Sequence, residues 1–129
     1  MTTDVSHPAA LRADRVRAIA SDLSGLRGPL LPVLHAVQHE LGHVDAADVP
    51  VISDVLNLAI AEVHGVVTFY RDFRREAGGR TTLRICPAEA CQAVGATALG
   101  AHARRRLGVE FGQTTSDGAV TLEEVFCLG

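Results

Sequence analysis

Three cysteines, two close together and one far along the chain, constrain this sequence more than any other feature does. Four residues separate Cys86 from Cys91, and a further 35 separate Cys91 from Cys127. Thiolates select soft metal centres, such as iron–sulfur clusters, zinc and Cu(I), over hard cations. A 2Fe–2S cluster normally takes four thiolates, so the three cysteines of these 129 residues predict a metal site that is one ligand short.

Composition and charge exclude several other classes of protein. The net charge is −3, and nucleic-acid binding has no support beyond the short basic run Arg104–Arg106. No apolar stretch reaches the roughly 20 residues that cross a bilayer, and the first residues lack the pattern of a secretory signal. We therefore expect a cytoplasmic protein without membrane insertion. In a reducing cytosol a group of cysteines is more often metal-binding or catalytic than a disulfide framework.

The periodicity of the chain changes at Gly78-Gly79, where we place the boundary between two modules. Residues 1–77 carry apolar side chains at helical spacing, which predicts a helical bundle. The expected helices are one that begins at a Ser6 cap and ends before Gly25, one over about 29–41 that Gly42 stops, one that begins at an Asp48 cap, and one over about 59–73.

Residues 78–129 mix strand and helix signals, which predicts an open α/β unit. The expected elements are a strand over Thr81–Ile85, an Ala-rich helix over Cys91–Leu107 that Gly108 ends, and two further strands over Val109–Thr115 and Val120–Phe126 that a hairpin turn at Asp117-Gly118 joins.

This order favours a metal centre at the cysteines. Cys86 follows a strand, and Cys91 is expected at or near a helix N-terminus, where free amides and the helix dipole would stabilise a negative cluster by about 0.3–2 kcal/mol. Amide hydrogen bonds to sulfur would also raise the reduction potential. Arg104–Arg106 is interpreted as a complement to the dipole at the other end of the same helix, on a solvated surface.

Other cysteine chemistries fit the spacing less well. The chain has no Cys-x-x-Cys motif, so thioredoxin-type dithiol exchange is not supported. Zinc with His102 as a fourth ligand is unfavourable, because His102 would lie about 16 Å beyond Cys91 along the helix. A structural zinc domain and ordinary buried thiols are the alternatives to a cluster.

With these residues in place, nearly the whole chain resembles the thioredoxin-like 2Fe–2S subunits that accompany the flavin subunit of NADH dehydrogenase (complex I), of NAD-reducing hydrogenases and of NAD-dependent formate dehydrogenases. That family has an early cysteine pair, a long gap and a second pair. Cys86 and Cys91 match the first pair and Cys127 matches the third ligand, so the resemblance implies a fourth cysteine ligand beyond Gly129.

A second group of residues carries the resemblance further. Gly65–Tyr70 is similar to the end of a helix in this family. His64, the segment Leu30–Gln38 and the segment Ala88–Gln92 are most similar to the gamma subunit of the molybdenum or tungsten NAD-dependent formate dehydrogenase.

The resemblance implies an N-terminal helical bundle over 1–77 that docks a partner, and a thioredoxin-like 2Fe–2S domain over 78–129 that is incomplete at its C-terminus. It implies that the first cysteine pair binds one iron, and that single electrons pass between the cluster and the FMN of a flavin- and NAD-binding diaphorase subunit. FMN, NAD, further iron–sulfur clusters and the molybdenum or tungsten cofactor would belong to partners, among them the catalytic formate dehydrogenase subunit.

We therefore interpret the chain as a non-catalytic electron-transfer subunit of a formate dehydrogenase complex. The equivalent subunit of complex I or of an NAD-reducing hydrogenase is the alternative within the family. A cluster-free structural or assembly subunit is the alternative of another class.

Several other residues suggest chemistry but have simpler interpretations. His35, His39 and His43 recur every four residues, yet Gly42 should turn His43 off the helix, so solvated or partner-facing side chains are favoured over a metal site. The remaining expectations are His64 as a core or interface histidine, Phe69 and Tyr70 as packing residues, Thr68–Tyr70 as support between docking face and cluster, and Glu89 as a solvated carboxylate or a charge that tunes the cluster.

Overall fold

The computed structural model describes residues 7–129. These residues form two compact units that divide between Ala77 and Gly78. No helix in the described part of the chain combines the length and apolar character needed to span a membrane. The expected cap at Ser6 lies outside the described residues.

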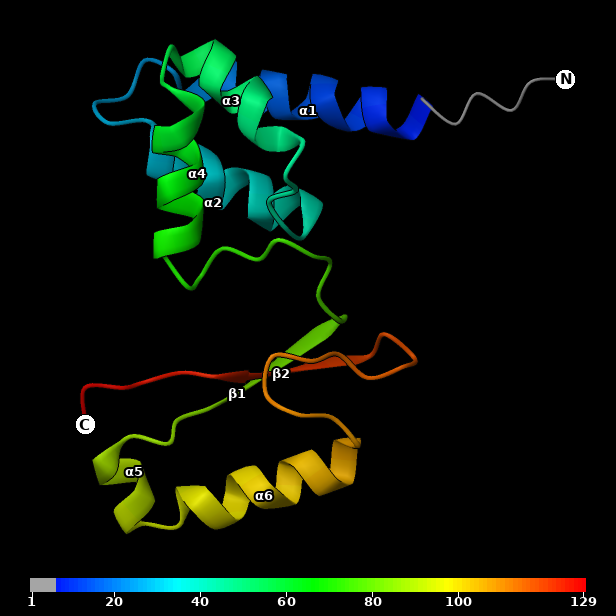
Figure 1. The fold of residues 1–129 in the computed structure, drawn as a ribbon, viewed down its shortest axis with the longest axis vertical. Helices are drawn as coiled ribbons and strands as arrows, with labels where there is room; N and C mark the ends of the chain where they lie inside the picture. The colour runs from blue at the N-terminus through cyan, green and yellow to red at the C-terminus, as the bar shows by residue number, and fades with distance from the viewer. Residues whose placement is uncertain (1–6) are drawn as a thin grey trace, which may run out of the picture. The chain divides into compact units, whose positions relative to one another are not determined.

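Four helices make up the first unit (Figure 1). They are α1 (His7–Leu23), α2 (Leu30–Leu41), α3 (Asp48–Leu56) and α4 (Ile60–Phe69). Helices α1 and α4 each pack against both α2 and α3. Each helix contributes aliphatic side chains to a common core, among them Val16, Leu34, Ile52 and Val63, all of which are fully enclosed.

The end of α2 follows directly from a glycine. Gly42 adopts a φ of 85°, a left-handed conformation that costs little only without a Cβ. Its N–H donates to Gln38 O at 2.8 Å and closes the last turn. His43 consequently leaves the face that carries His35 and His39, as the sequence predicts.

Two details of the first unit differ from expectation. Ala47 rather than Asp48 occupies the N-cap of α3, and Asp48 is its first residue. The fourth helix ends at Phe69, because the next residue, Tyr70, is already extended with φ −87° and ψ 118°. Phe73 is buried all the same, as part of the chain that follows the helix.

A buried ion pair explains why Asp48 is not a cap. The Asp48 side chain is 2% exposed, and its two oxygens accept hydrogen bonds from Arg12 Nε at 2.9 Å and Arg12 Nη2 at 2.7 Å. The N–H of Asp45 donates to the same carboxylate at 2.8 Å. The hydrogen bond with Asp48 raises the pKa of Arg12. The pair thus ties α1 to the start of α3.

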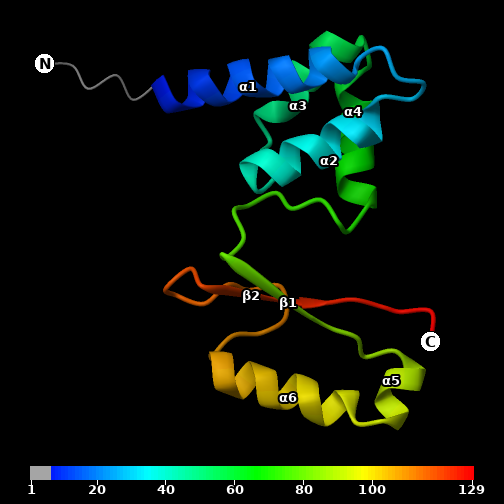
Figure 2. The same cartoon turned by 180° about the vertical axis from the view of Figure 1, so that it is seen from behind.

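The second unit is a small α/β structure. Its elements are β1 (Thr81–Ile85), α5 (Glu89–Ala93), α6 (Ala96–Leu107) and β2 (Val120–Glu124). The two strands are parallel, with Thr81 opposite Val120 and Ile85 opposite Glu124. Parallel neighbours need a crossover connection, and here it contains both helices. Both views place α6 alongside the strands (Figures 1 and 2), where Ile85, Ala103 and Leu122 form a core.

The expected single helix over Cys91–Leu107 is wrong. The structure has two helices, separated at Gly95, whose φ is 104°. That backbone conformation is incompatible with a continuous right-handed helix. Cys91 therefore belongs to the five-residue α5, and Arg104–Arg106 ends α6 instead. The basic run and Cys91 do not share one helix dipole.

The expected strand over Val109–Thr115 is also wrong. Glu110 and Gln113 form a turn, in which Gln113 N donates to Glu110 O at 3.1 Å and Glu110 N donates to Gln113 Oε1 at 2.9 Å. A turn here prevents extended pairing, and a single bridge between Thr114 and Thr121 remains. The turn at Asp117-Gly118 forms as predicted, with Gly118 N bonded to Thr115 O at 2.9 Å.

Gly79 marks the closest approach between the start of β1 and β2. A Cβ at Gly79 would lie 2.9 Å from Val120 N and 3.0 Å from Thr121 N, both of them backbone atoms. We expect Gly79→Ala to destabilise the second unit by about 1–3 kcal/mol, because backbone must move to admit the methyl group. Faster amide hydrogen exchange in 81–85 and 120–124 would measure this.

Gly65→Ala is the matched control for that substitution. A Cβ at Gly65 meets nothing within 4 Å, and alanine in a helix interior is favoured over glycine by about 0.5–1 kcal/mol. Exchange in the two strands should therefore stay at the wild-type rate. Unchanged exchange in Gly79→Ala would show that the strands absorb the methyl group without cost.

Candidate metal centre

The three cysteines converge where the two strands end. Cys86 follows β1 directly, Cys91 is the third residue of α5, and Cys127 lies in the segment after β2. Parallel neighbours end at the same edge of a sheet, so the residues after them are close in space although far apart in sequence. The three Sγ atoms lie within 4.8 Å of one another. Within residues 7–129 this is the group of three or more metal-binding side chains that the structure brings together.

Backbone amides surround these sulfurs unequally. Cys86 Sγ accepts hydrogen bonds from Cys127 N at 3.2 Å and from Ala88 N at 3.4 Å. Cys127 Sγ accepts one from Gly129 N at 3.4 Å and lies 3.5 Å from Cys91 Sγ. The sequence indicated amide donors at Cys91 through a helix N-terminus. In the described part of the chain the amides instead reach Cys86 and Cys127.

These contacts shift the thiol pKa values in opposite directions. The N–H groups of Cys127 and Ala88 lower the pKa of Cys86 to about 7, because they stabilise its thiolate. The neighbouring thiols of Cys127 and Cys86 raise the pKa of Cys91 to about 11. Ionising one thiol therefore opposes ionisation of the next, unless a cation lies between them.

The donor set fits an iron–sulfur centre. Thiolate sulfur is the ligand of such clusters, and a bound cationic metal would remove the mutual opposition of three adjacent thiolates. The sulfurs are close enough together for one small inorganic centre. Cys86 and Cys91 are half-buried and Cys127 is exposed, so part of the site faces outward.

The histidines do not form a second metal site. The His35 ring packs against Phe73 with ring centroids 4.9 Å apart. His39 is exposed, and His43 Nε2 lies 3.6 Å from Asp45 Oδ2. His64 is exposed, so its expected place in the core is wrong, because it lies on the outer side of α4. The imidazole of His102 is exposed on α6 and does not join the cysteine group.

Phe69 differs from its expected packing role. Its side chain is 77% exposed and touches Tyr70 edge-on, with ring centroids 5.0 Å apart. Both rings border an apolar cavity of about 770 Å³ within the first unit, between α4 and the start of α2. Glu89, the first residue of α5, is exposed, which agrees with a solvated carboxylate.

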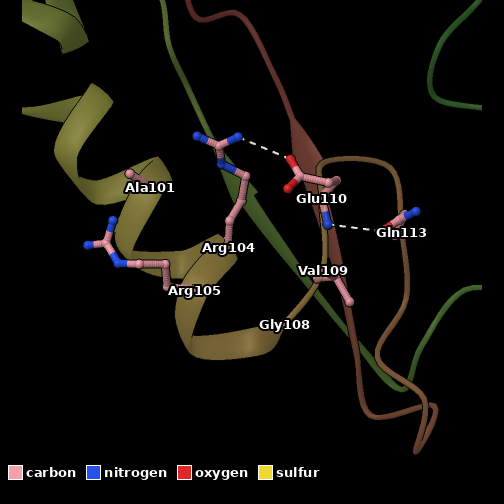
Figure 3. A pocket seen from close by; sticks show the side chains of 7 residues that line it. All are labelled: Ala101, Arg104, Arg105, Gly108, Val109, Glu110 and Gln113. Carbon is pink, nitrogen blue, oxygen red and sulfur yellow. Dashed lines mark hydrogen bonds and ion pairs between the residues drawn. The ribbon is translucent and has the colours of Figure 1, made fainter.

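A second cavity, of about 370 Å³, lies where α6 ends (Figure 3). Arg104 reaches across it to Glu110, with Nη1 and Oε2 3.0 Å apart, and Gln113 lines its far side. Arg104 also lies over the Phe111 ring, 5.9 Å from its centroid. Arg104 is thus a half-buried structural residue rather than a purely solvated one, whereas Arg105 is exposed.

Comparison with known proteins agrees with this geometry. The family model of the thioredoxin-like [2Fe-2S] ferredoxins matches residues 16–129. The chain therefore belongs to the thioredoxin-like [2Fe-2S] ferredoxin family, and the cofactor of the cysteine site is a 2Fe–2S cluster.

Relatives in this family include the E subunits of NADH-quinone oxidoreductases. The E subunit of Pseudomonas aeruginosa is 36% identical over 103 residues, which is 80% of this chain and 62% of that protein. In Rhizobium meliloti the E subunit that bears the number 2 is 34% identical over 116 residues, covering 90% and 69% of the two chains. The E subunit of Mycobacterium tuberculosis H37Rv is 38% identical over 101 residues, covering 78% of this chain and 40% of that protein. This chain therefore spans about 40–69% of these relatives.

Proposed function

We propose that this chain is the electron-transfer component of a multisubunit NADH dehydrogenase-type complex and is not itself a catalyst. The observation that carries the proposal is the convergence of three thiols, from β1, α5 and the segment after β2, within 4.8 Å. The similarity to several E subunits of NADH-quinone oxidoreductases supports it.

In this proposal Cys86, Cys91 and Cys127 are cluster ligands, and a cysteine beyond Gly129 supplies the fourth. When bound, the 2Fe–2S cluster supplies a centre that accepts and donates one electron. The chain itself holds the ligands in place and offers the N–H groups of Ala88, Cys127 and Gly129 to the sulfurs. These donors stabilise the negative charge that an added electron brings.

The partner proposed for electron exchange is the FMN-bearing diaphorase subunit, and the first unit is the proposed docking element. The exposed Phe69 and the adjacent apolar cavity support a docking role for α4. The proposed location is the cytoplasm.

A finer proposal is that the complex is an NAD-dependent formate dehydrogenase. The similarity of His64, Leu30–Gln38 and Ala88–Gln92 to its gamma subunit supports this choice. The equivalent subunits of complex I and of NAD-reducing hydrogenases are the competing assignments, and the similarity to NADH-quinone oxidoreductase subunits favours complex I. Purification of the tagged chain with its partners, followed by assays for formate-, quinone- and hydrogen-linked NAD turnover, distinguishes the three.

Metal analysis of the intact chain tests the cluster itself. About two irons and two acid-labile sulfides per chain, with brown colour, would support a 2Fe–2S subunit. Zinc without sulfide would instead indicate a structural zinc domain. Absence of both would indicate a cluster-free assembly subunit, and either result would overturn the proposal.

Ala88 provides a direct test of the amide donors. Its φ of −60° is one that proline adopts, so Ala88→Pro removes the N–H that Cys86 Sγ accepts without changing a ligand. We expect the reduction potential to fall by roughly 60 mV, a tenfold change for a one-electron couple. A redox titration followed by electron paramagnetic resonance measures it.

Ala88→Ser is the matched control, because serine keeps the backbone N–H. Its reduction potential should stay close to that of the wild type. Equal potentials in the proline and serine variants would contradict a role for this hydrogen bond.

A further inference from the structure

Two of the three thiols are placed to react with each other when no cluster is bound. Cys91 Sγ and Cys127 Sγ lie 3.5 Å apart, and a disulfide requires an approach of about 1.5 Å more. Neither residue is buried. Cys127 belongs to a segment outside any helix or strand, and Cys91 belongs to a helix of five residues. A small movement of either backbone would close the gap.

Cys86 differs from this pair in its hydrogen bonds. Its sulfur accepts the N–H groups of Ala88 and Cys127. Rotation of the Cys86 side chain toward another sulfur would break both contacts, whereas Cys91 Sγ gives up no backbone contact within residues 7–129. The folded chain therefore distinguishes one pair of thiols from the third.

We propose that the cluster-free chain forms a reversible disulfide between Cys91 and Cys127, with a low-molecular-weight disulfide such as glutathione disulfide as the oxidant. One cysteine thiolate attacks glutathione disulfide, which forms a mixed disulfide and releases one glutathione thiolate. The second cysteine thiolate then attacks the cysteine sulfur of the mixed disulfide and releases a second glutathione. Two protein thiols are oxidised and one glutathione disulfide is reduced to two glutathiones.

The disulfide closes the metal centre to iron, because it removes two of the three thiolates that the centre offers. This consequence rests on the proposed ligand set, whereas the disulfide rests only on the positions of the sulfurs. Reduction by a dithiol restores both ligands. The site is thereby protected against irreversible thiol oxidation until a cluster is inserted.

The identity of the bonded pair separates native geometry from random encounter. In an unfolded chain, closure of the short loop between Cys86 and Cys91 costs the least entropy. Random oxidation thus favours a bond between these two residues. The folded structure favours Cys91 with Cys127 instead.

Peptide mapping of the full chain tests the proposal. The cluster-free protein is treated with glutathione disulfide, its free thiols are alkylated, and it is cleaved after glutamate. Cleavage after Glu76, Glu89, Glu110 and Glu124 places the cysteines in separate peptides, 77–89, 90–110 and 125–129. We expect peptide 90–110 joined to 125–129 as the dominant product, with Cys86 alkylated. A dominant link from 77–89 to either other peptide would overturn the proposal.

Two measurements keep the result decisive. Cys86→Ser should form the same linked peptides, and Cys127→Ser should not. Far-UV circular dichroism of the cluster-free chain records whether its helices persist; loss of structure together with a Cys86–Cys91 product also counts against the proposal.

Iron loading then separates this inference from the proposed function. The reduced chain should take up iron and sulfide, and the oxidised chain should take up neither until a dithiol is added. Failure of the reduced chain to load would contradict the cluster-binding function while leaving the disulfide intact. Equal loading of both forms would contradict closure of the site.

Discussion

Cys127→Ala is expected to reduce the iron and acid-labile sulfide of the purified chain to background and to abolish its visible absorption. The substitution leaves Cys86 and Cys91 as the remaining thiols of the 129 residues. A 2Fe–2S cluster normally needs four thiolates, and each lost ligand also removes metal-binding free energy that contributes to folding. Alanine is chosen over serine because a serine oxygen can itself act as a ligand.

Glu89→Gln is the matched control for this loss. Glu89 lies in the same loop and carries an exposed carboxylate, so its removal should leave iron, sulfide and absorption at wild-type levels. A parallel loss in both variants would point to a damaged fold. Full iron and sulfide content in Cys127→Ala would contradict the participation of Cys127 in the centre.

Arg12→Met should destabilise the first unit by about 3–5 kcal/mol, because it leaves the buried Asp48 carboxylate without its counter-charge. Asp48 is 2% exposed, and after the substitution Asp45 N remains its hydrogen-bond donor. Urea unfolding can be followed through Tyr70, the single tyrosine of a chain without tryptophan. The double variant Arg12→Met/Asp48→Leu should recover most of the lost stability, since neither charge then remains buried.

Arg17→Met provides the comparison. Arg17 pairs with Asp54 at 2.9 Å, but the two side chains are 52% and 71% exposed. Exposed pairs typically contribute less than about 1 kcal/mol, so the unfolding midpoint should shift little. Equal effects of the two arginine substitutions would show that burial of Asp48 does not determine the stability of this unit.

The sequence predicted well those features that a few neighbouring residues decide. The helix over about 29–41 ends at Leu41 because Gly42 adopts a left-handed backbone. The strand over Thr81–Ile85 forms as expected from its β-favouring residues. The turn at Asp117-Gly118 forms for the same local reason.

The sequence predicted poorly where a distant contact or one backbone angle overrides a local pattern. Gly95 divides an Ala-rich segment that reads as one helix. Asp48 resembles a cap in the sequence but binds Arg12, 36 residues earlier in the chain. His64 stands among apolar neighbours in the sequence, yet it lies on the exposed side of α4.

The sequence by itself determined the chemistry available to this protein: three thiolates within 129 residues, spaced as in a known family of iron–sulfur proteins. The tertiary structure alone decided the environment of those thiolates. Parallel pairing of β1 with β2 brings Cys127 N to Cys86 Sγ across 41 positions of sequence. Local periodicity carries no information about such a contact, because it depends on which strands pair and in what register.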